Sequence, residues 1–175
     1  MIIKTLLLKG SIVVAVSLTI VYADANTVGK NNIGAGAGFV TGYGLSYRHW
    51  FNKNGIQATF APYYSKDKNE TDYSLSVGVT GLHTLKEAKY VNLLVYFGPH
   101  FWYNHQKGLM VHYDETTGYS DNFSEKFLFF GGGPGFDFHF WKMSFNLMFG
   151  LAGRTNFENN SGIQFTGEAG LYYSF

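Results

Sequence analysis

The sequence predicts an all-β protein, an eight-stranded antiparallel transmembrane β-barrel with up-and-down topology. Apolar and polar residues alternate with period two in eight segments, as in strands whose two faces meet different environments. Most of these segments are about 10 residues long, the length that a tilted strand needs to cross a bilayer. The connections between them alternate between short and long, which is typical of barrels with short turns on one side of a membrane and longer loops on the other.

Residues 1–23 predict a secretory signal peptide rather than a strand. Two lysines precede an apolar run over residues 11–22, and small residues follow it. A membrane anchor is the alternative, but the run is short for a span of about 20 residues. We therefore expect residues 1–23 to be cleaved, 24–31 to form a short periplasmic segment, and 32–175 to form one outer-membrane barrel domain.

The apolar residues that recur at every second position justify each strand in turn. In the first four strands they are Ile33, Ala35, Ala37 and Phe39 in 32–40; Leu45 and Tyr47 in 42–51; Ala58 and Phe60 in 56–65; and Leu75, Val77 and Val79 in 73–84. In the last four they are Val91, Leu93, Val95 and Phe97 in 90–103; Phe136, Phe138 and Phe140 in 127–140; Met143, Phe145, Leu147 and Phe149 in 142–153; and Ile163, Phe165, Leu171 and Tyr173 in 163–175. We expect this set to face lipid and the intervening polar set to face the lumen.

Pro62, Pro99 and Pro134 fall inside the predicted strands. Proline lacks the N–H that a β-ladder uses, so it is disfavoured in a paired strand. We expect bulges, or strand ends beyond the membrane, at these positions.

The lengths of the connections predict how the barrel is oriented in the membrane. The short ones are 52–55, 86–89 and 141–142, and the long polar ones are 66–72, 104–126 and 154–162. A tight link near 40–42 is the exception, because a long loop is expected there. With eight strands both ends of the barrel lie on one side, so the short turns and the chain's end are predicted to be periplasmic and the long loops extracellular.

The amino-acid composition excludes several other classes of protein. The net charge is +1, which gives no electrostatic reason to expect a nucleic-acid partner. No segment after residue 23 has an apolar run long enough for a membrane-spanning helix of about 20 residues, and the absence of cysteine excludes disulfides and thiol chemistry. Aromatic residues gather at predicted strand ends, where they suit anchoring at both membrane interfaces.

The last eight residues carry the most specific signal. Glu168, Gly170, Tyr173 and Phe175 fill the polar, glycine, aromatic and terminal aromatic places of a pattern that resembles the C-terminal assembly signal of bacterial outer-membrane β-barrels. The chain as a whole resembles the small OmpA/OmpX-type barrels. This resemblance implies localisation in the bacterial outer membrane, recognition by the barrel-assembly machinery, and contact with outer-membrane lipids and lipopolysaccharide.

One hairpin brings together residue types that could catalyse a reaction. A two-residue turn at 141–142 would align His139 with Ser144 and Asp137 with Asn146 on the lumen face. Ser144, His139 and Asp137 could then act as nucleophile, base and orienting group. The alternative is a hydrogen-bonded interior, because an eight-stranded barrel is just wide enough to be filled by side chains.

We prefer that second interpretation, a polar network in the lumen. Arg48, Asp137, His139, Asn146 and Glu168 all fall on the inward-facing set. A buried charge needs a partner, so we expect Arg48 to pair with Glu168 or Asp137. Inward glycines in segment 32–40 leave room for the long side chains to meet, and the resemblance to OmpA/OmpX-type barrels implies such a network.

The six histidines predict no metal centre, because they form no short ligand pair. His105 and His112 share the long loop 104–126 with Asp114 and Glu115, where solvated side chains are the simpler interpretation. We therefore expect no metal and no cofactor.

Three functions remain open. The first is a non-conducting structural or surface-interaction barrel without enzyme activity, with loop 104–126 as the place for a partner. The second is a lipid-modifying enzyme that hydrolyses or transfers acyl chains of lipid A with Ser144, His139 and Asp137. The third is a soluble ligand-binding barrel of lipocalin type, in which apolar residues would lie inside and polar residues outside.

Overall fold

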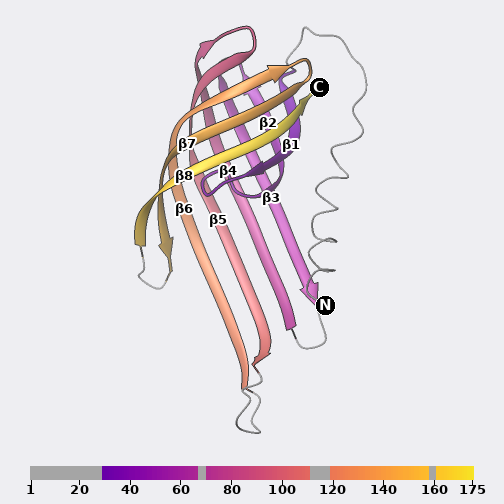
Figure 1. Ribbon diagram of the computed structural model, residues 1–175, viewed down its shortest axis with the longest axis vertical. Coiled ribbons are helices and arrows are strands. Elements are labelled where there is room, and N and C mark those ends of the chain that lie inside the picture. The colour runs from indigo at the N-terminus through magenta and orange to yellow at the C-terminus, as the bar shows by residue number, and fades with distance from the viewer. Residues whose placement is uncertain (1–28, 67–69, 111–118, 158–160) are drawn as a thin grey trace.

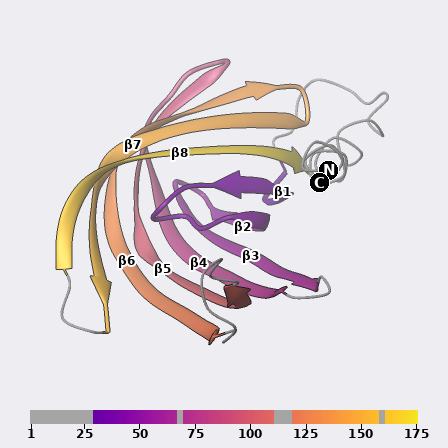
Figure 2. The same ribbon diagram turned by 60° about the horizontal axis from the view of Figure 1, so that its bottom comes forward.

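The computed structural model describes residues 29–66, 70–110, 119–157 and 161–175. These residues form eight antiparallel strands that close into a barrel (Figures 1 and 2). The strands are β1 (Asn31–Ala37), β2 (Gly44–Phe51), β3 (Asn54–Lys66), β4 (Glu70–Glu87), β5 (Val91–Met110), β6 (Tyr119–Phe140), β7 (Met143–Asn156) and β8 (Ser161–Ser174). The expected signal peptide lies outside the described residues.

Each strand pairs with its neighbours in the sequence, and β1 pairs with β8 to close the barrel. The closing register runs from Asn32 opposite Ser174 to Ala37 opposite Ala169. The predicted fold class, strand number and up-and-down order are therefore confirmed. Among the described residues, none belongs to a helix that is long and apolar enough to span a membrane.

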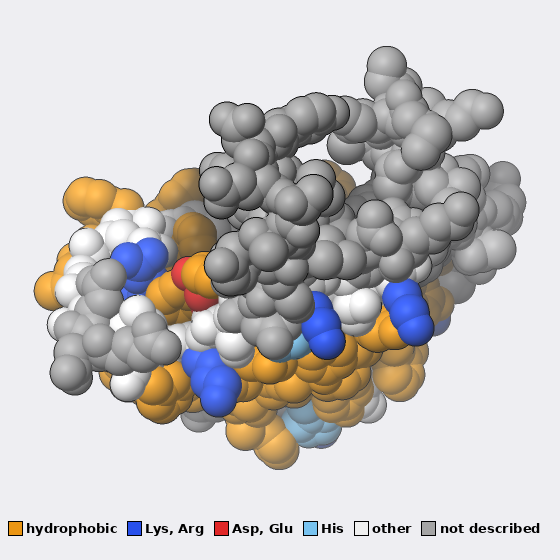
Figure 3. Space-filling model, turned by 90° about the horizontal axis from the view of Figure 1, so that it is seen from below, with side chains coloured by type: hydrophobic (Ala, Val, Ile, Leu, Met, Phe, Trp, Pro, Cys, Tyr) orange, Lys and Arg blue, Asp and Glu red, His pale blue; other side chains and the backbone are white. Residues whose placement is uncertain are grey.

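The two faces of the sheet differ as the alternation predicts. Val77, Val95, Phe145 and Leu171 expose 36–44% of their surface on the outer wall, and Leu147 and Tyr173 on the same face are half-buried. The inward set contains the buried Arg48, Ser76, Asn146 and Glu168 and the half-buried Asn92. Hydrophobic side chains cover much of the outer wall in Figure 3. This arrangement is the reverse of the one expected for a lipocalin-type barrel.

The strands differ greatly in length, which makes the barrel one-sided. β1 and β2 have 7 and 8 residues, whereas β4, β5 and β6 have 18, 20 and 22. In Figure 1 the long strands extend far past the first two at one end. We call this the hairpin end, and we call the opposite end, with the three short turns and Phe175, the turn end.

The predicted long loops are largely wrong. The region 66–72 is strand up to Lys66 and again from Glu70, β7 and β8 take up both ends of 154–162, and most of 104–126 belongs to β5 and β6. The reason is that alternation of polarity marks a strand only where its two faces differ. Where both faces meet water, polar residues continue the ladder without a sequence signal.

The connection between β1 and β2 also departs from the prediction. The first strand ends at Ala37, before the end of the expected 32–40, and the second begins at Gly44, after the start of the expected 42–51, so residues 38–43 join them. Gly42 and Gly44 have φ angles of +81° and +115°, which turn the chain out of the ladder and which other residues rarely adopt. Residues 38–43 fold into the barrel, and we call them the lumen loop.

Each of the three prolines is paired with one neighbouring strand and lacks a pair with the other. β4 and β5 pair Gly78 with His100 and Gly81 with Phe97, and the intervening pair that would include Pro99 is missing. The β6–β7 ladder is interrupted in the same way at Pro134. Pro62 lies beyond the last pair between β2 and β3. Missing pairs, rather than bulges, therefore accommodate the missing N–H groups.

Candidate functional site

The lumen loop closes the interior of the barrel. Val40 and Thr41 at its tip are 0% and 1% exposed. Val40 belongs to a buried apolar cluster with side chains from β4, β5 and β7, namely Leu82, Leu94, Tyr96, Met148 and Ala152. The middle of the lumen is therefore filled by packed apolar side chains around the loop, in addition to the polar residues that the sequence predicts there.

Glu168 on β8 holds the loop from one wall. Its carboxylate accepts hydrogen bonds from the backbone N–H groups of Val40 (3.0 Å) and Thr41 (2.9 Å) and from the Thr41 hydroxyl (2.6 Å). The Thr166 hydroxyl donates a fourth. A side chain at Gly38 would overlap this carboxylate, so the glycine leaves the space that Glu168 occupies. The described residues provide only neutral donors to Glu168, so hydrogen bonds stabilise its buried charge.

Ser76 on β4 and His100 on β5 hold the loop from the opposite wall. Ser76 Oγ accepts the backbone N–H of Tyr43 at 2.9 Å and lies 3.0 Å from His100 Nε2. His100 Nδ1 lies 2.9 Å from the backbone oxygen of Phe39. A carbonyl can only accept, so Nδ1 carries the proton, and in the neutral ring Nε2 accepts from the serine hydroxyl. The sequence analysis did not single out this pair.

The predicted polar network is divided into two groups. Arg48 forms an ion pair with Asp137 at 3.3 Å, one of the two expected alternatives, and binds Gln57 Oε1 at 2.9 Å. Its guanidinium lies over the Tyr172 ring, 4.0 Å from the centroid. Glu168 is not part of this group, because it binds the lumen loop. Asn146 makes no side-chain hydrogen bond within the described chain.

The candidate catalytic residues lie near one another but are not joined as a triad. The register pairs His139 with Ser144 and Asp137 with Asn146, as the two-residue turn predicts. His139 Nε2 is 3.7 Å from Asp137, and neither ring nitrogen makes a hydrogen bond to any described residue. A nucleophile needs a hydrogen bond to its base, so the geometry does not support a triad here.

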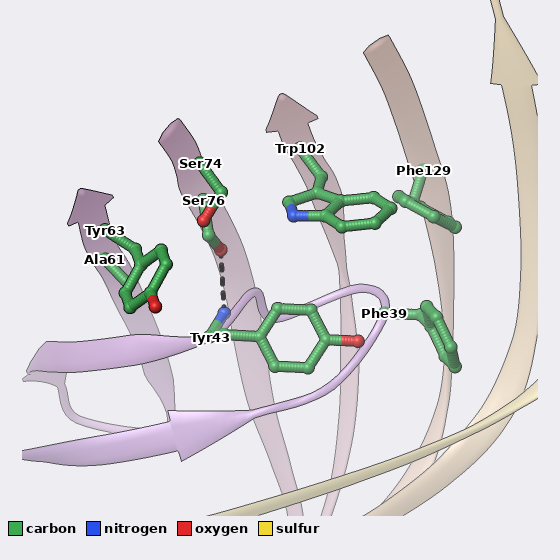
Figure 4. A pocket seen from close by; sticks show the side chains of 8 residues that line it. All are labelled: Phe39, Tyr43, Ala61, Tyr63, Ser74, Ser76, Trp102 and Phe129. Atoms are coloured by element: carbon green, nitrogen blue, oxygen red, sulfur yellow. Dashed lines mark hydrogen bonds between the residues drawn. The ribbon is translucent and has the colours of Figure 1, made fainter. Parts of the chain in front are cut away.

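A cavity of about 320 Å³ lies above the lumen loop, toward the hairpin end. Five aromatic side chains line it: Phe39, Tyr43, Tyr63, Trp102 and Phe129. Figure 4 shows them around one space, with Trp102 and Tyr43 on facing sides. Ser74 and Ser76 supply hydroxyl groups.

The four residues of the C-terminal signature have structural roles as well. Glu168 holds the lumen loop, and a side chain at Gly170 would meet the Tyr172 ring at 2.6 Å, so this glycine makes room for the ring that packs on Arg48. Tyr173 faces outward, and Phe175 is 59% exposed with its N–H bound to the backbone oxygen of Asn31 at 2.9 Å.

The described histidines are spread over several strands. Within the described ranges, no group of three or more His, Asp or Glu side chains is arranged to hold a metal ion. The weak site considered in 104–126 involves His112, Asp114 and Glu115, which lie outside the described residues.

No protein-family model and no curated protein matches the sequence. Among solved structures, the chain is similar to a major outer membrane protein from Thermus thermophilus, with a TM-score of 0.50 and 15% identity over 83% of this chain and 98% of that one. The chain has the fold of an eight-stranded outer-membrane β-barrel.

Two further solved structures resemble this barrel. The N-terminal β-barrel domain of OprF from Pseudomonas aeruginosa has a TM-score of 0.44 and 14% identity, over 83% of this chain and 95% of that one. Neisserial surface protein A has a TM-score of 0.42 and 15% identity, over 86% and 100%. At identities this low, the likeness concerns the fold alone.

Proposed function

We propose that this protein is a non-conducting barrel of the bacterial outer membrane that displays strands β3–β6 at the cell surface. One observation carries the proposal: the lumen loop crosses the interior and is bound on both walls. Glu168 fixes its tip on one side, and Ser76 with His100 fixes its two ends on the other. The buried cluster around Val40 packs apolar side chains against the loop in the middle of the lumen.

The outer wall supports placement in a membrane. Large apolar side chains are exposed along all eight strands, and Ile163 and Phe165 expose 81% and 88% of their surface. Leaving such a wall in water would be costly, at about 25 cal/mol for each Å² of apolar area. Outer-membrane lipids and lipopolysaccharide are the partners that we propose for it.

The hairpin end supports a role at the surface. With the turn end in the periplasm, β4, β5 and β6 project outward beyond the rest of the barrel. The described parts of 104–126 are the ends of β5 and β6, the longest pair of strands. We propose 104–126 as the place where a surface partner would bind. We propose that no lipid chemistry accompanies this role, since Ser144 and His139 lack the required hydrogen bond.

The biogenesis proposal rests on the C-terminal residues. Tyr173 and Phe175 lie on the outer wall next to the closing pair of strands, where the assembly machinery could read them before closure. We propose that Glu168 and Gly170 serve the same signal in addition to their contacts in the folded barrel.

Planar-bilayer recording tests the function. The refolded protein should insert without producing stepwise ionic current, and a porin refolded in the same detergent should conduct as the control. Reproducible channels from the unmodified protein would contradict the proposal. Proteolysis of intact cells gives the orientation, because cleavage within 104–126 should occur from outside and the short turns should be protected.

A further inference from the structure

The cavity above the lumen loop is an aromatic cage rather than a generic gap. Trp102 from β5 and Tyr43 from the loop lie on facing sides, Tyr63 from β3 closes one flank, and Phe39 and Phe129 close the other (Figure 4). Phe39 contacts Tyr43 edge to face at 6.4 Å and Phe129 at 5.4 Å between ring centroids. The volume of about 320 Å³ is at the small end of ligand pockets, so it suits a compact group rather than a long chain.

The rings of this cage are fixed before any ligand arrives. Trp102 stacks on Phe127 at 5.6 Å with an interplanar angle of 15°, and Phe129 stacks on His100 at 5.5 Å and 16°. The backbone of Tyr43 is bound to Ser76, and its ring packs edge-on against His100. A binding site with restrained side chains loses little conformational entropy when a ligand enters.

The electrostatic environment favours a cation. No residue that lines the cage is charged, and aromatic faces carry partial negative charge. The carboxylate of Glu168 lies below the cage and has no cationic partner among the described residues. The alternation along β4, β6 and β7 also puts two carboxylates, Asp72 and Glu125, and one guanidinium, Arg154, on the inner face near the cage, so that with Glu168 the acidic groups outnumber the basic one.

We propose that this cage binds a small organic cation, an ammonium group carrying methyl or other short alkyl substituents. Such groups are attracted to the faces of Trp and Tyr within about 6 Å, and their apolar substituents suit an aromatic wall better than a bare metal ion would. The barrel already shows this preference next to the cage, where the Arg154 guanidinium lies 5.3 Å from the centroid of Phe127. Ser74 offers a hydroxyl for a polar end of the ligand.

Calorimetric titration of the refolded full-length barrel with choline chloride tests the proposal. The detergent should be a polyoxyethylene ether, because zwitterionic choline and amine-oxide detergents would compete. We expect saturable binding of choline and of tetramethylammonium. The uncharged isostere 3,3-dimethylbutan-1-ol should bind at least tenfold more weakly, because it has the same shape without the charge.

Matched variants locate the site. Trp102→Leu should weaken choline binding at least tenfold, Trp102→Phe should weaken it less, and Trp141→Phe at the turn end should leave it unchanged. A heat-modifiability gel on each variant verifies that the barrel is folded. Equal binding of choline and its uncharged isostere would overturn the proposal in favour of a purely apolar pocket. Binding of glucose or maltose without choline, or no binding of either cation, would also overturn it.

Discussion

Glu168 is the residue at which closure of the lumen can be tested most directly. Its carboxylate accepts four hydrogen bonds, two of them from the backbone of the lumen loop. In Glu168→Ala, the N–H groups of Val40 and Thr41 lose their acceptor. Each buried donor left without a partner costs about 1–3 kcal/mol, so the closed position of the loop should be destabilised by about 2–6 kcal/mol.

An opposing contribution comes from Val40, whose burial in the lumen stabilises the closed position by about 1.5–3 kcal/mol. The equilibrium between the closed and the displaced positions of the lumen loop therefore shifts toward the displaced position in Glu168→Ala. In Glu168→Gln the equilibrium between the closed and the displaced loop should change less, because the amide oxygen still accepts a backbone N–H. The NH₂ group of the glutamine, however, then faces other donors. We expect the alanine variant to be the most open, the glutamine variant to be intermediate, and the unmodified barrel to be closed.

Single-channel recording in planar bilayers measures this order directly, and a heat-modifiability gel verifies that each variant is a folded barrel. We expect current steps from Glu168→Ala that are rare in Glu168→Gln and absent in the unmodified protein. Folded Glu168→Ala that remains silent, with an unchanged unfolding temperature, would refute the view that this carboxylate holds the loop. Of the two partners that the sequence predicts for Arg48, Glu168 is wrong, because Arg48 pairs with Asp137.

Three further predictions concern other parts of the barrel. Asp137→Ala should lower the free energy of unfolding by about 3–5 kcal/mol in urea titrations, because it leaves Arg48 as a buried cation without its partner; an unchanged midpoint would contradict this. Deleting Phe175, or making it and Tyr173 polar, should sharply reduce the amount of protein in outer-membrane fractions while export continues, and normal levels would exclude an assembly role. Ser144→Ala should cost about 1 kcal/mol, and mass spectra of lipid A should be the same with either form; loss of a lipid A modification in the variant alone would favour the enzyme.

The outer wall and the turns were predictable because they depend on residues that are close together in the sequence. Alternation fixes which residues face out, and the two-residue turn after Phe140 fixes the register of β6 and β7, including His139 opposite Ser144. The contact of Glu168 with Thr41 was not predictable, because 127 residues separate them and only the folded loop brings them together. Glycines around residues 36–44 were the available signal, since they allow both the turn and the close approach of a carboxylate.

The pair of Ser76 and His100 was missed for a different reason. The two strands shift register between Thr84 and Lys86, so counting from the turn would align Ser76 one residue away from its actual neighbour Trp102. A bulge has no sequence signature here, and a one-residue error exchanges the two faces of a strand. The inner-face contacts of β4 and β5 therefore depend on an irregularity that alternation does not reveal.

The closed lumen and the aromatic cage share one element. Phe39 and Tyr43 line the cage, and both belong to the lumen loop. Trp102 belongs to the cage wall and not to the lumen loop, so Trp102→Leu should weaken choline binding at least tenfold while the barrel stays non-conducting. Glu168→Ala releases the loop and removes both the negative charge and the cage floor, so conductance should rise and choline binding should fall together. If the lumen loop is both the plug of the barrel and the floor of the cage, Trp102→Leu should change choline binding alone. Glu168→Ala should then change conductance and choline binding together.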